Sequence, residues 1–300
     1  MRKTTLWTAA LWIGAILVAA VSARAEQSVS ETRSVTANAT ISIENVAGSL
    51  TIIGSDTNEV VVTGTMGDDV EELEISSDDG ELYIEVVIPD DDDWKRERKI
   101  AADLEVHVPQ GATLDIEAVS ASIEISGVNG PIEAASVSGS VAVAGGSSDI
   151  EVESVSGGVT VTGGSGSIAA ESVSGQVVLN GVAGDLEAQT VSGEIRIDAG
   201  TVDDVDIESV AGGVYFKGQL GNGSLDVESH SGNVEILLPA DVSAEFEMES
   251  FSGRIESDFG PPARHSDGYE PGSSTEFRIG MGEAEVSVQT FSGNIMVQKY

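Results

Sequence analysis

The sequence contains no cysteine, so disulfides, thiol nucleophiles, cysteine-based zinc sites and lipid attachment to a cysteine are all excluded for this chain. Aromatic side chains make up only 4% of the residues, which predicts a thin core built from Val, Ile and Leu. Histidine occurs only at His107, His230 and His265. Three scattered histidines do not predict a metal site or a catalytic triad.

Basic residues are also scarce, with 14 Lys and Arg against 51 Asp and Glu and a formal net charge of −37. Nucleic acids and anionic lipid surfaces repel such a chain, so no nucleic-acid partner is expected. Cations and basic surfaces are attracted to it. The alternative interpretation is that the acidity serves solubility or adaptation to salt and implies no partner.

The N-terminal segment at 1–25 differs from the rest of the chain. Arg2 and Lys3 precede an apolar run at 6–21, and Ala23-Arg24-Ala25 fits a small-x-small cleavage pattern. These features predict a secretory signal peptide at 1–25, with an uncleaved anchor as the alternative. No other stretch is apolar enough to cross a membrane, so we expect an exported protein that is not integral to the membrane after cleavage.

What the sequence has in abundance is an internal repeat. A tetrad of the type Ser-Val-Ser-Gly recurs, mostly at spacings of 18 to 21 residues. The first interval is 73 residues long, which is room for about four repeat units. The last interval is 40 residues long, which is room for two units or for one unit with a long insertion. The last residue of the tetrad falls at Gly48, Ala121, Gly139, Gly157, Gly175, Gly193, Gly212, Gly232, Gly253 and Gly293.

Apolar residues keep fixed positions relative to this tetrad. They stand seven residues before its last residue and two and four residues after it, with Ser257 as the one polar exception. Such alternation predicts two short strands per unit, as at 150–154 and 158–161, facing a core. One unit buries too little to fold alone, so we expect the units to stack and their strands to pair.

The sequence therefore predicts an all-β fold, a single parallel β-solenoid with two-strand coils of about 18 residues and, as the better expectation, right-handed winding. We expect an irregular N-terminal β cap with the first coils at 26–101, including an acidic-basic loop at 89–99. The regular solenoid follows at 102–300, with a loop insertion at 259–274.

The tetrad contains a hydroxyl residue that continues the inward alternation, at Ser136, Ser154, Ser172, Thr190, Ser209, Ser229, Ser250 and Thr290. A buried hydroxyl at a corner can bond the backbone that turns there. This structural role is favoured over a catalytic serine, because no histidine repeats with the column. His230 replaces the tetrad valine in one unit and is expected to be partly buried.

These tetrads resemble those of the DUF4097 β-strand-repeat family of bacterial envelope proteins, the "putative adhesins". The run Asp103-Leu104-Glu105-Val106-His107-Val108-Pro109, followed by Gly111-Ala112, resembles the entry into that family's repeat. The resemblance covers residues 37–300. It implies the solenoid fold and a place in the periplasm or on the bacterial cell surface, and it supplies no catalytic residues. The insertion after Gly253 departs from the family's regular pattern.

The outward positions of the first strand carry many carboxylates, among them Glu151, Glu153, Glu171 and Glu187. Stacked coils lie about 4.8 Å apart, so such carboxylates repel one another, and divalent cations such as Ca²⁺ could bridge them. The aspartates at 90–93 are a second set of candidate calcium ligands. The alternative is a solvated face screened by salt, and no other cofactor is expected.

Two irregular segments are candidate contact sites. The loop at 89–99 contains Trp94, the one tryptophan outside the expected signal peptide, among acidic and basic residues. It fits a contact hot spot or a solvated linker. The insertion at 259–274 offers Arg264, His265, Asp267 and Tyr269, and long loops on rigid scaffolds often carry function. A tolerated surface insertion is the alternative there.

These features favour a non-catalytic binding, adhesion or structural module of the cell envelope, with a protein or glycan of the envelope or surface as partner. A polysaccharide-active β-helix enzyme is the alternative. It is less favoured, because such sites need basic residues or paired carboxylates with aromatic side chains. On the regular units Arg196 and Lys217 stand almost alone as basic residues.

Overall fold

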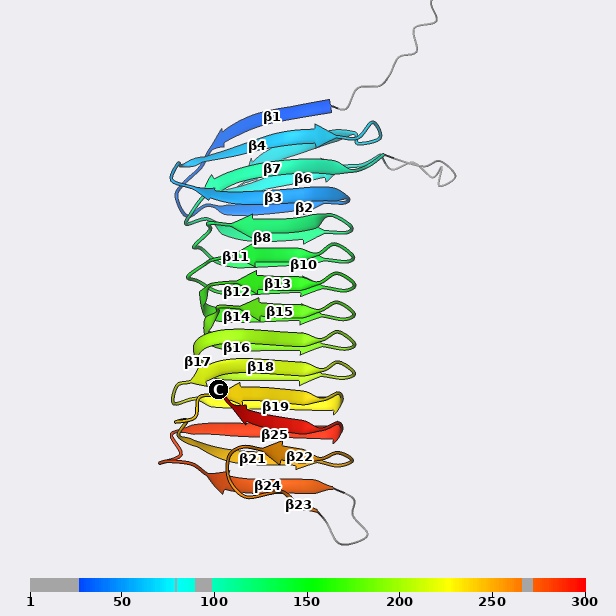
Figure 1. The fold of residues 1–300 in the computed structure, drawn as a ribbon. Helices are drawn as coiled ribbons and strands as arrows, with labels where there is room; N and C mark the ends of the chain where they lie inside the picture. The colour runs from blue at the N-terminus through cyan, green and yellow to red at the C-terminus, as the bar shows by residue number, and fades with distance from the viewer. Residues whose placement is uncertain (1–26, 79, 90–98, 266–271) are drawn as a thin grey trace, which may run out of the picture.

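The computed structural model describes residues 27–78, 80–89, 99–265 and 272–300. These residues contain strands, turns and loops but no helix, and the strands lie one above another in a long stack (Figure 1). The prediction of an all-β fold is confirmed, and most neighbouring strands are parallel. The expected signal peptide lies outside the described residues.

Two ladders of parallel strands form the stack, and each coil gives one strand to each ladder. In spatial order the first ladder contains β2 (Thr40–Asn45), β8 (Thr113–Ala118), β10 (Ile132–Ser136), β12 (Ile150–Ser154), β14 (Ser165–Ser172), β16 (Ala183–Thr190), the second half of β17 (Ile195–Ser209), β19 (Ser224–Ser231), β25 (Ala284–Ser292) and β21 (Ala244–Ser250).

The second ladder contains β3 (Gly48–Ser55), β9 (Ser122–Ser126), β11 (Val141–Ala144), β13 (Val159–Thr162), β15 (Val177–Asn180), the first half of β17, β18 (Val214–Leu220), β20 (Val234–Leu238), β26 (Ile295–Lys299) and β22 (Ile255–Ser257). The register follows the repeat, because Ile150 pairs with Ile132 on one side and with Ile168 on the other. The handedness of the winding stays a prediction.

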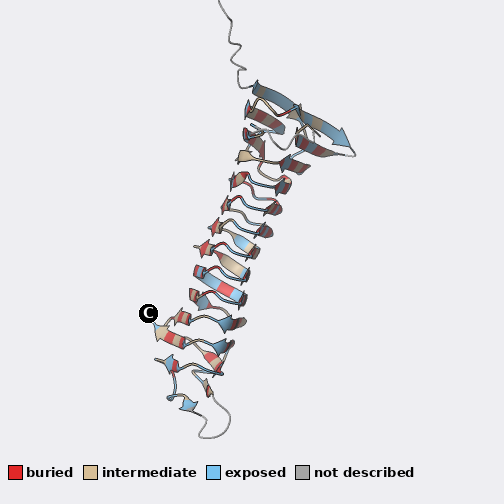
Figure 2. Cartoon of the chain, turned by 90° about the vertical axis from the view of Figure 1, so that its right-hand side faces the viewer, coloured by how far each residue is buried: buried red, intermediate tan, exposed pale blue. Residues whose placement is uncertain are grey.

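The core lies between the two ladders. Every apolar residue in the three columns that the tetrad defines is buried. In β13, for example, Val159 and Val161 are buried while Thr162 is exposed, and this alternation recurs along the strands (Figure 2). Each fully buried aliphatic side chain contributes roughly 1.5–3 kcal/mol. Stacking extends these few residues per coil into one continuous core.

The tetrad glycine is required by crowding between coils. A Cβ atom on Gly175 would lie 1.9 Å from the carbonyl oxygen of Gly157 in the next coil. Gly175 does not have a positive φ, so the left-handed conformation is not the reason for glycine there. At the opposite corner it is the reason, because Gly163 and Gly164 have φ of 72° and 107°.

At the N-terminal end the coils are not stacked in chain order. The coil β2–β3 lies between β8–β9 and a later coil made of β6 (Glu81–Val87) and β7 (Ala102–Pro109). Three antiparallel strands close this end: β4 (Glu59–Met66) pairs with β7, β1 (Gln27–Ser34) with β4, and β5 (Glu72–Asp78) with β6. They lie at the top of Figure 1.

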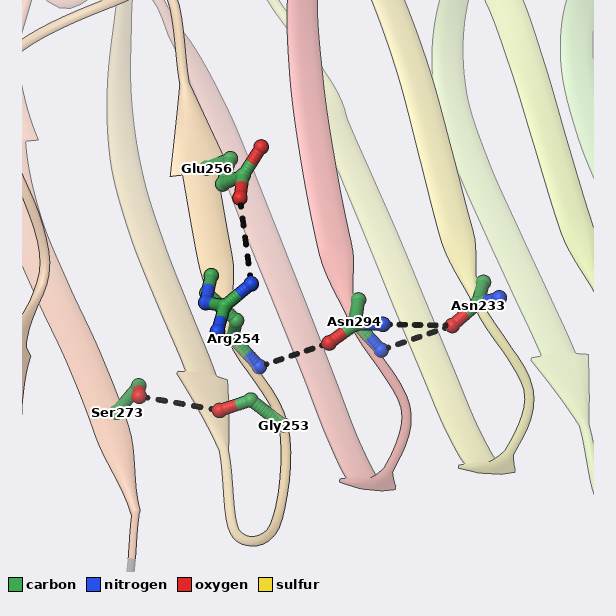
Figure 3. A network of polar contacts seen from close by, with 6 residues as sticks. All are labelled: Asn233, Gly253, Arg254, Glu256, Ser273 and Asn294. Atoms are coloured by element: carbon green, nitrogen blue, oxygen red, sulfur yellow. Dashed lines mark hydrogen bonds and ion pairs between the residues drawn. The ribbon is translucent and has the colours of Figure 1, made fainter.

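The C-terminal end shows the same departure from chain order. The last coil, β25–β26, lies between β19–β20 and β21–β22, so the chain ends inside the stack. Side chains at one corner show this order (Figure 3): the Nδ2 and backbone N–H of Asn294 donate to Asn233, and the N–H of Arg254 donates to Asn294. Beyond β21 lie the antiparallel strands β24 (Ser273–Arg278) and β23 (Arg264–His265).

Candidate binding groove

A groove with a volume of about 920 Å³ runs along one edge of the stack, where each tetrad leaves the first ladder. Consecutive residues of one coil after another line it. In the coil of β14, Glu171 forms one wall, Ser172 the floor and Val173 the other wall. The repeat therefore gives the groove nearly the same chemistry along its length.

One wall is a line of exposed side chains that we call the apolar ridge. Because the tetrad hydroxyl points inward, the next residue points outward, and its valine is 44–50% exposed in coil after coil. In spatial order the ridge consists of Val119, Val137, Val155, Val173, Val191, Val210, His230, Phe291 and Phe251, and all of these except Val119 line the groove. Contiguous exposed apolar surface of this kind marks an interaction site.

The opposite wall, which we call the acid wall, is formed by the residues before the hydroxyl positions. In spatial order it consists of Glu117, Ala135, Glu153, Glu171, Gln189, Glu208, Glu228, Gln289 and Glu249. Partial burial, with the charges of Glu153 and Glu187 nearby, raises the pKa of Glu171. At Glu171 the charged form is therefore held at a cost that a nearby cation would offset.

The floor is the column of tetrad hydroxyls. Ser172 Oγ accepts a hydrogen bond of 2.8 Å from the N–H of Gly175 and donates one of 3.0 Å to the carbonyl of Gly157 in the neighbouring coil. Ser154 makes the same two bonds with Gly157 and Gly139. These hydroxyls hold each corner and join it to the next, as the sequence predicts.

The C-terminal end of the groove differs from its middle. The rings of His230, Phe291 and Phe251 stack in that order along the ridge, with centroids 5.0 and 4.8 Å apart. The expectation that His230 is partly buried is wrong, since it lies outward on the ridge and is exposed. The sequence could have shown this, because the alternation that buries Ser229 turns the following side chain outward.

Beneath these rings, the hydroxyls of Ser229 and Thr290 have no hydrogen-bond partner among the described residues, although each residue is only 5% exposed. Ser229 and Thr290 are paired neighbours in adjacent strands. β19 and β25 continue past them to Ser231 and Ser292, so the backbone does not turn back toward the hydroxyl as it does after Ser154. Both oxygen atoms are shielded from solvent, so these two hydroxyls lack the corner hydrogen bonds that Ser154 and Ser172 make.

The family model described as Toastrack DUF4097 matches residues 18–298. This chain belongs to that family. No curated protein matches it. Since the match spans nearly the whole chain, the groove, the ridge and the out-of-order coils are features of a Toastrack protein.

Solved structures show a similar fold at low sequence identity. A "putative adhesin" from Parabacteroides merdae is 9% identical, with a TM-score of 0.51 over 91% of this chain and 96% of that chain. A "putative adhesin" from Bacteroides fragilis is 12% identical, with a TM-score of 0.46 over 90% and 97%. A "putative lipid binding protein" from Parabacteroides distasonis is 15% identical, with a TM-score of 0.47 over 91% and 96%. At these identities the likeness concerns the fold.

The carboxylates predicted as calcium ligands fall on two separate lines of this Toastrack protein. Glu153 and Glu171 are paired neighbours in the acid wall. Glu151 and Glu187 lie outside the groove, on either side of Ala169. The described part of the chain holds no group of three or more His, Cys, Asp or Glu residues that could bind a metal. Calcium bridging therefore stays a proposal.

The other predicted site residues do not line the groove within the described part of the chain. Arg264 and His265 form β23 at the end of the stack, where they pair with Ser274 and Ser273 of β24, and Arg264 is exposed. Trp94, Asp267, Tyr269 and the aspartates Asp90, Asp91, Asp92 and Asp93 lie outside the described residues. Among the residues that the structure describes, there is no helix that could span a membrane.

Proposed function

We propose that this chain is a non-catalytic binding module of the bacterial cell envelope and that it holds an elongated partner in the groove. The apolar ridge carries this proposal. Eight apolar side chains, each about half exposed, form one line along the stack, although leaving them in water gives no stability to the fold. A partner that covers this line would be stabilised by burying the apolar surface that the fold leaves exposed.

The groove's repetition supports binding in preference to catalysis. A catalytic site places one distinct group against one reacting atom. Here the middle of the groove offers the same carboxylate, hydroxyl and valine in neighbouring coils, for example Glu153-Ser154-Val155 and Glu171-Ser172-Val173. The hydroxyls there are already bonded to the backbone.

The proposed location rests on the sequence and on the relatives. The basic start, apolar run and small residues at 1–25 support export, and the name of the Parabacteroides merdae neighbour fits a surface or envelope protein. We further propose that the coil stack is a right-handed β-solenoid fixed in the periplasm or on the cell surface. Its partner would be an envelope or surface component, and the chain would not be integral to the membrane.

Photo-crosslinking in the cells that make the protein tests this function. p-Benzoylphenylalanine is placed singly at Val155, Val173 and Val191 on the ridge, and at Val178 on the outward side of the second ladder as the control. We expect discrete crosslinked products from the ridge positions and none from Val178. Equal products from all four positions, or none from the ridge, would remove the groove as the binding surface.

A further inference from the structure

We propose that the occupant of the groove is an extended polypeptide segment in which basic and apolar side chains alternate, lying lengthwise along the stack. This inference rests on the proposed function and names its ligand class. Its grounds are the charge of the groove, the apolar ridge that faces the acid wall, and the length of the groove.

The negative charge of the groove favours a cationic ligand. Six of the nine acid-wall positions are Glu, and no Lys or Arg is among the described residues that line the groove. Burial and the neighbouring carboxylates raise the pKa of Glu171, because both disfavour its charged form. An anionic lipid, nucleic acid or acidic glycan would add repulsion along the full length. Ammonium or guanidinium groups on one side of a peptide would instead face the acid wall.

The ridge selects for apolar side chains on the opposite side of the same ligand. Val155, Val173 and Val191 lie directly across the hydroxyl floor from the acid wall. A purely polar polycation would satisfy the carboxylates and leave the ridge in water. Because successive side chains of an extended chain point to opposite sides, alternating basic and apolar residues would face both walls at once.

The length of the groove sets the length of an extended ligand. Nine coils spaced about 4.8 Å apart make the groove about 38 Å long. An extended chain rises about 3.3 Å per residue, so about 12 residues, or six Lys-Leu repeats, fill the length.

The C-terminal end of the ridge offers the largest apolar contact. The stacked rings of His230, Phe291 and Phe251 present more apolar surface than a valine does, so apolar side chains at one end of the peptide would pack there.

Fluorescence anisotropy with labelled synthetic peptides tests this inference on the purified chain from Glu26 to Tyr300. The probes contain two, four, six or eight Lys-Leu repeats, and the controls contain six repeats of Glu-Leu or of Lys-Ser. We expect affinity to increase with length up to six repeats, which fill the groove, and then to level off. Both controls should bind at least tenfold more weakly than the six-repeat Lys-Leu peptide.

Variants with equal charge locate the binding. The double variant Glu153→Gln and Glu171→Gln should bind the six-repeat Lys-Leu peptide roughly fivefold more weakly, as expected for the loss of two exposed ion pairs. Glu133→Gln with Glu151→Gln removes the same charge from a neighbouring pair outside the groove and should change affinity less than about twofold. Equal losses in the two double variants would reduce the effect to net charge and overturn the inference.

The length series and the crosslinks separate the remaining outcomes. A helix rises only about 1.5 Å per residue, so affinity that still increases from six to eight repeats would indicate a helical ligand and overturn the extended one. Ridge-specific crosslinks in cells without binding of the Lys-Leu peptides would refute this ligand class alone. Failure of both experiments would refute the binding function as well.

Discussion

The middle of the groove and its C-terminal end are made from the same tetrad, but they use it differently. In the middle, Ser154 and Ser172 are each bonded to two glycines, and the ridge is valine. At the end, Ser229 and Thr290 lack partners in the described structure, and the ridge is aromatic. Corner hydrogen bonds explain the hydroxyls of the middle but not its exposed valines. At the end those bonds are missing, and the rings of His230, Phe291 and Phe251 stack across three coils, so ring contacts join the coils there.

The largest expected effect on stability comes from a substitution in the middle of the stack. Gly175→Ala places a Cβ atom 1.9 Å from a backbone oxygen that the stack holds in place, so the coils must separate locally. We expect a loss of at least about 3 kcal/mol in the free energy of unfolding, measured by denaturant titration.

Gly145→Ala is the control for this substitution. Gly145 has a φ of 82°, but nothing lies within 4 Å of the position that its Cβ would take, so only the backbone conformation is penalised. Its cost should be about 1–2 kcal/mol. Equal losses for the two variants would show that Gly175 is required for a reason other than the close approach of the coils.

A smaller effect separates the two kinds of hydroxyl. Ser172→Ala removes two hydrogen bonds and leaves a buried glycine N–H and a carbonyl without their partner, which should cost about 1–3 kcal/mol. Ser229→Ala removes a hydroxyl that has no partner in the described structure, so stability should stay within about 0.5 kcal/mol. Thermal and denaturant unfolding of the two variants measures the contrast. A loss at Ser229 as large as that at Ser172 would contradict it.

The regular coils were predictable because their pattern is local. Alternate apolar residues such as Val159 and Val161 specify a strand with one buried face, and a repeated unit specifies parallel stacking. The order of the coils was not predictable. Each coil offers nearly the same edge for strand pairing. Pairing rules alone therefore do not predict that the coil β25–β26 lies next to β19–β20, between it and β21–β22. Contacts between distant residues decide it, such as Phe291 stacking on both His230 and Phe251.

The groove was only partly visible in the sequence. The inward hydroxyls and outward carboxylates follow from alternation, and so does the exposure of Val155 and its copies. The ridge was missed because valine is expected inside a strand protein, and here serine takes the inward position beside it. The unpartnered hydroxyl of Ser229 depends on where β19 ends, and the sequence does not define strand ends to within two residues.

The acid wall should make stability depend on pH. The pKa of Glu171 in the folded chain is raised above its ordinary value of 4.5 by burial, with Glu153 and Glu187 adding repulsion. A raised carboxyl pKa means that the folded state binds the proton more tightly, so this contribution to stability decreases as pH rises through the window above 4.5. We expect the midpoint temperature of unfolding to rise as the pH is lowered from 7 to 5.

Glu171→Gln should reduce that rise, because glutamine does not titrate. Glu194→Gln, which removes one charge from an exposed corner, serves as the control. Differential scanning calorimetry at several pH values measures the midpoints. An identical pH dependence in the parent chain and in Glu171→Gln would show that repulsion at the acid wall does not affect stability.

The smallest expected effect concerns calcium. Glu153 and Glu171 form one pair of adjacent carboxylates in the acid wall, and Glu208 and Glu228 form another, because Gln189 and Gln289 interrupt the wall. Two carboxylates make a weak site. At a few millimolar CaCl₂, binding should add at most about 1 kcal/mol and raise the melting midpoint by about 2–4 °C over NaCl at matched ionic strength. Glu171→Gln should reduce this difference, because it removes one of the two pairs. Equal midpoints for the parent chain in the two salts would leave the acidity to attract a basic partner or to keep the chain soluble.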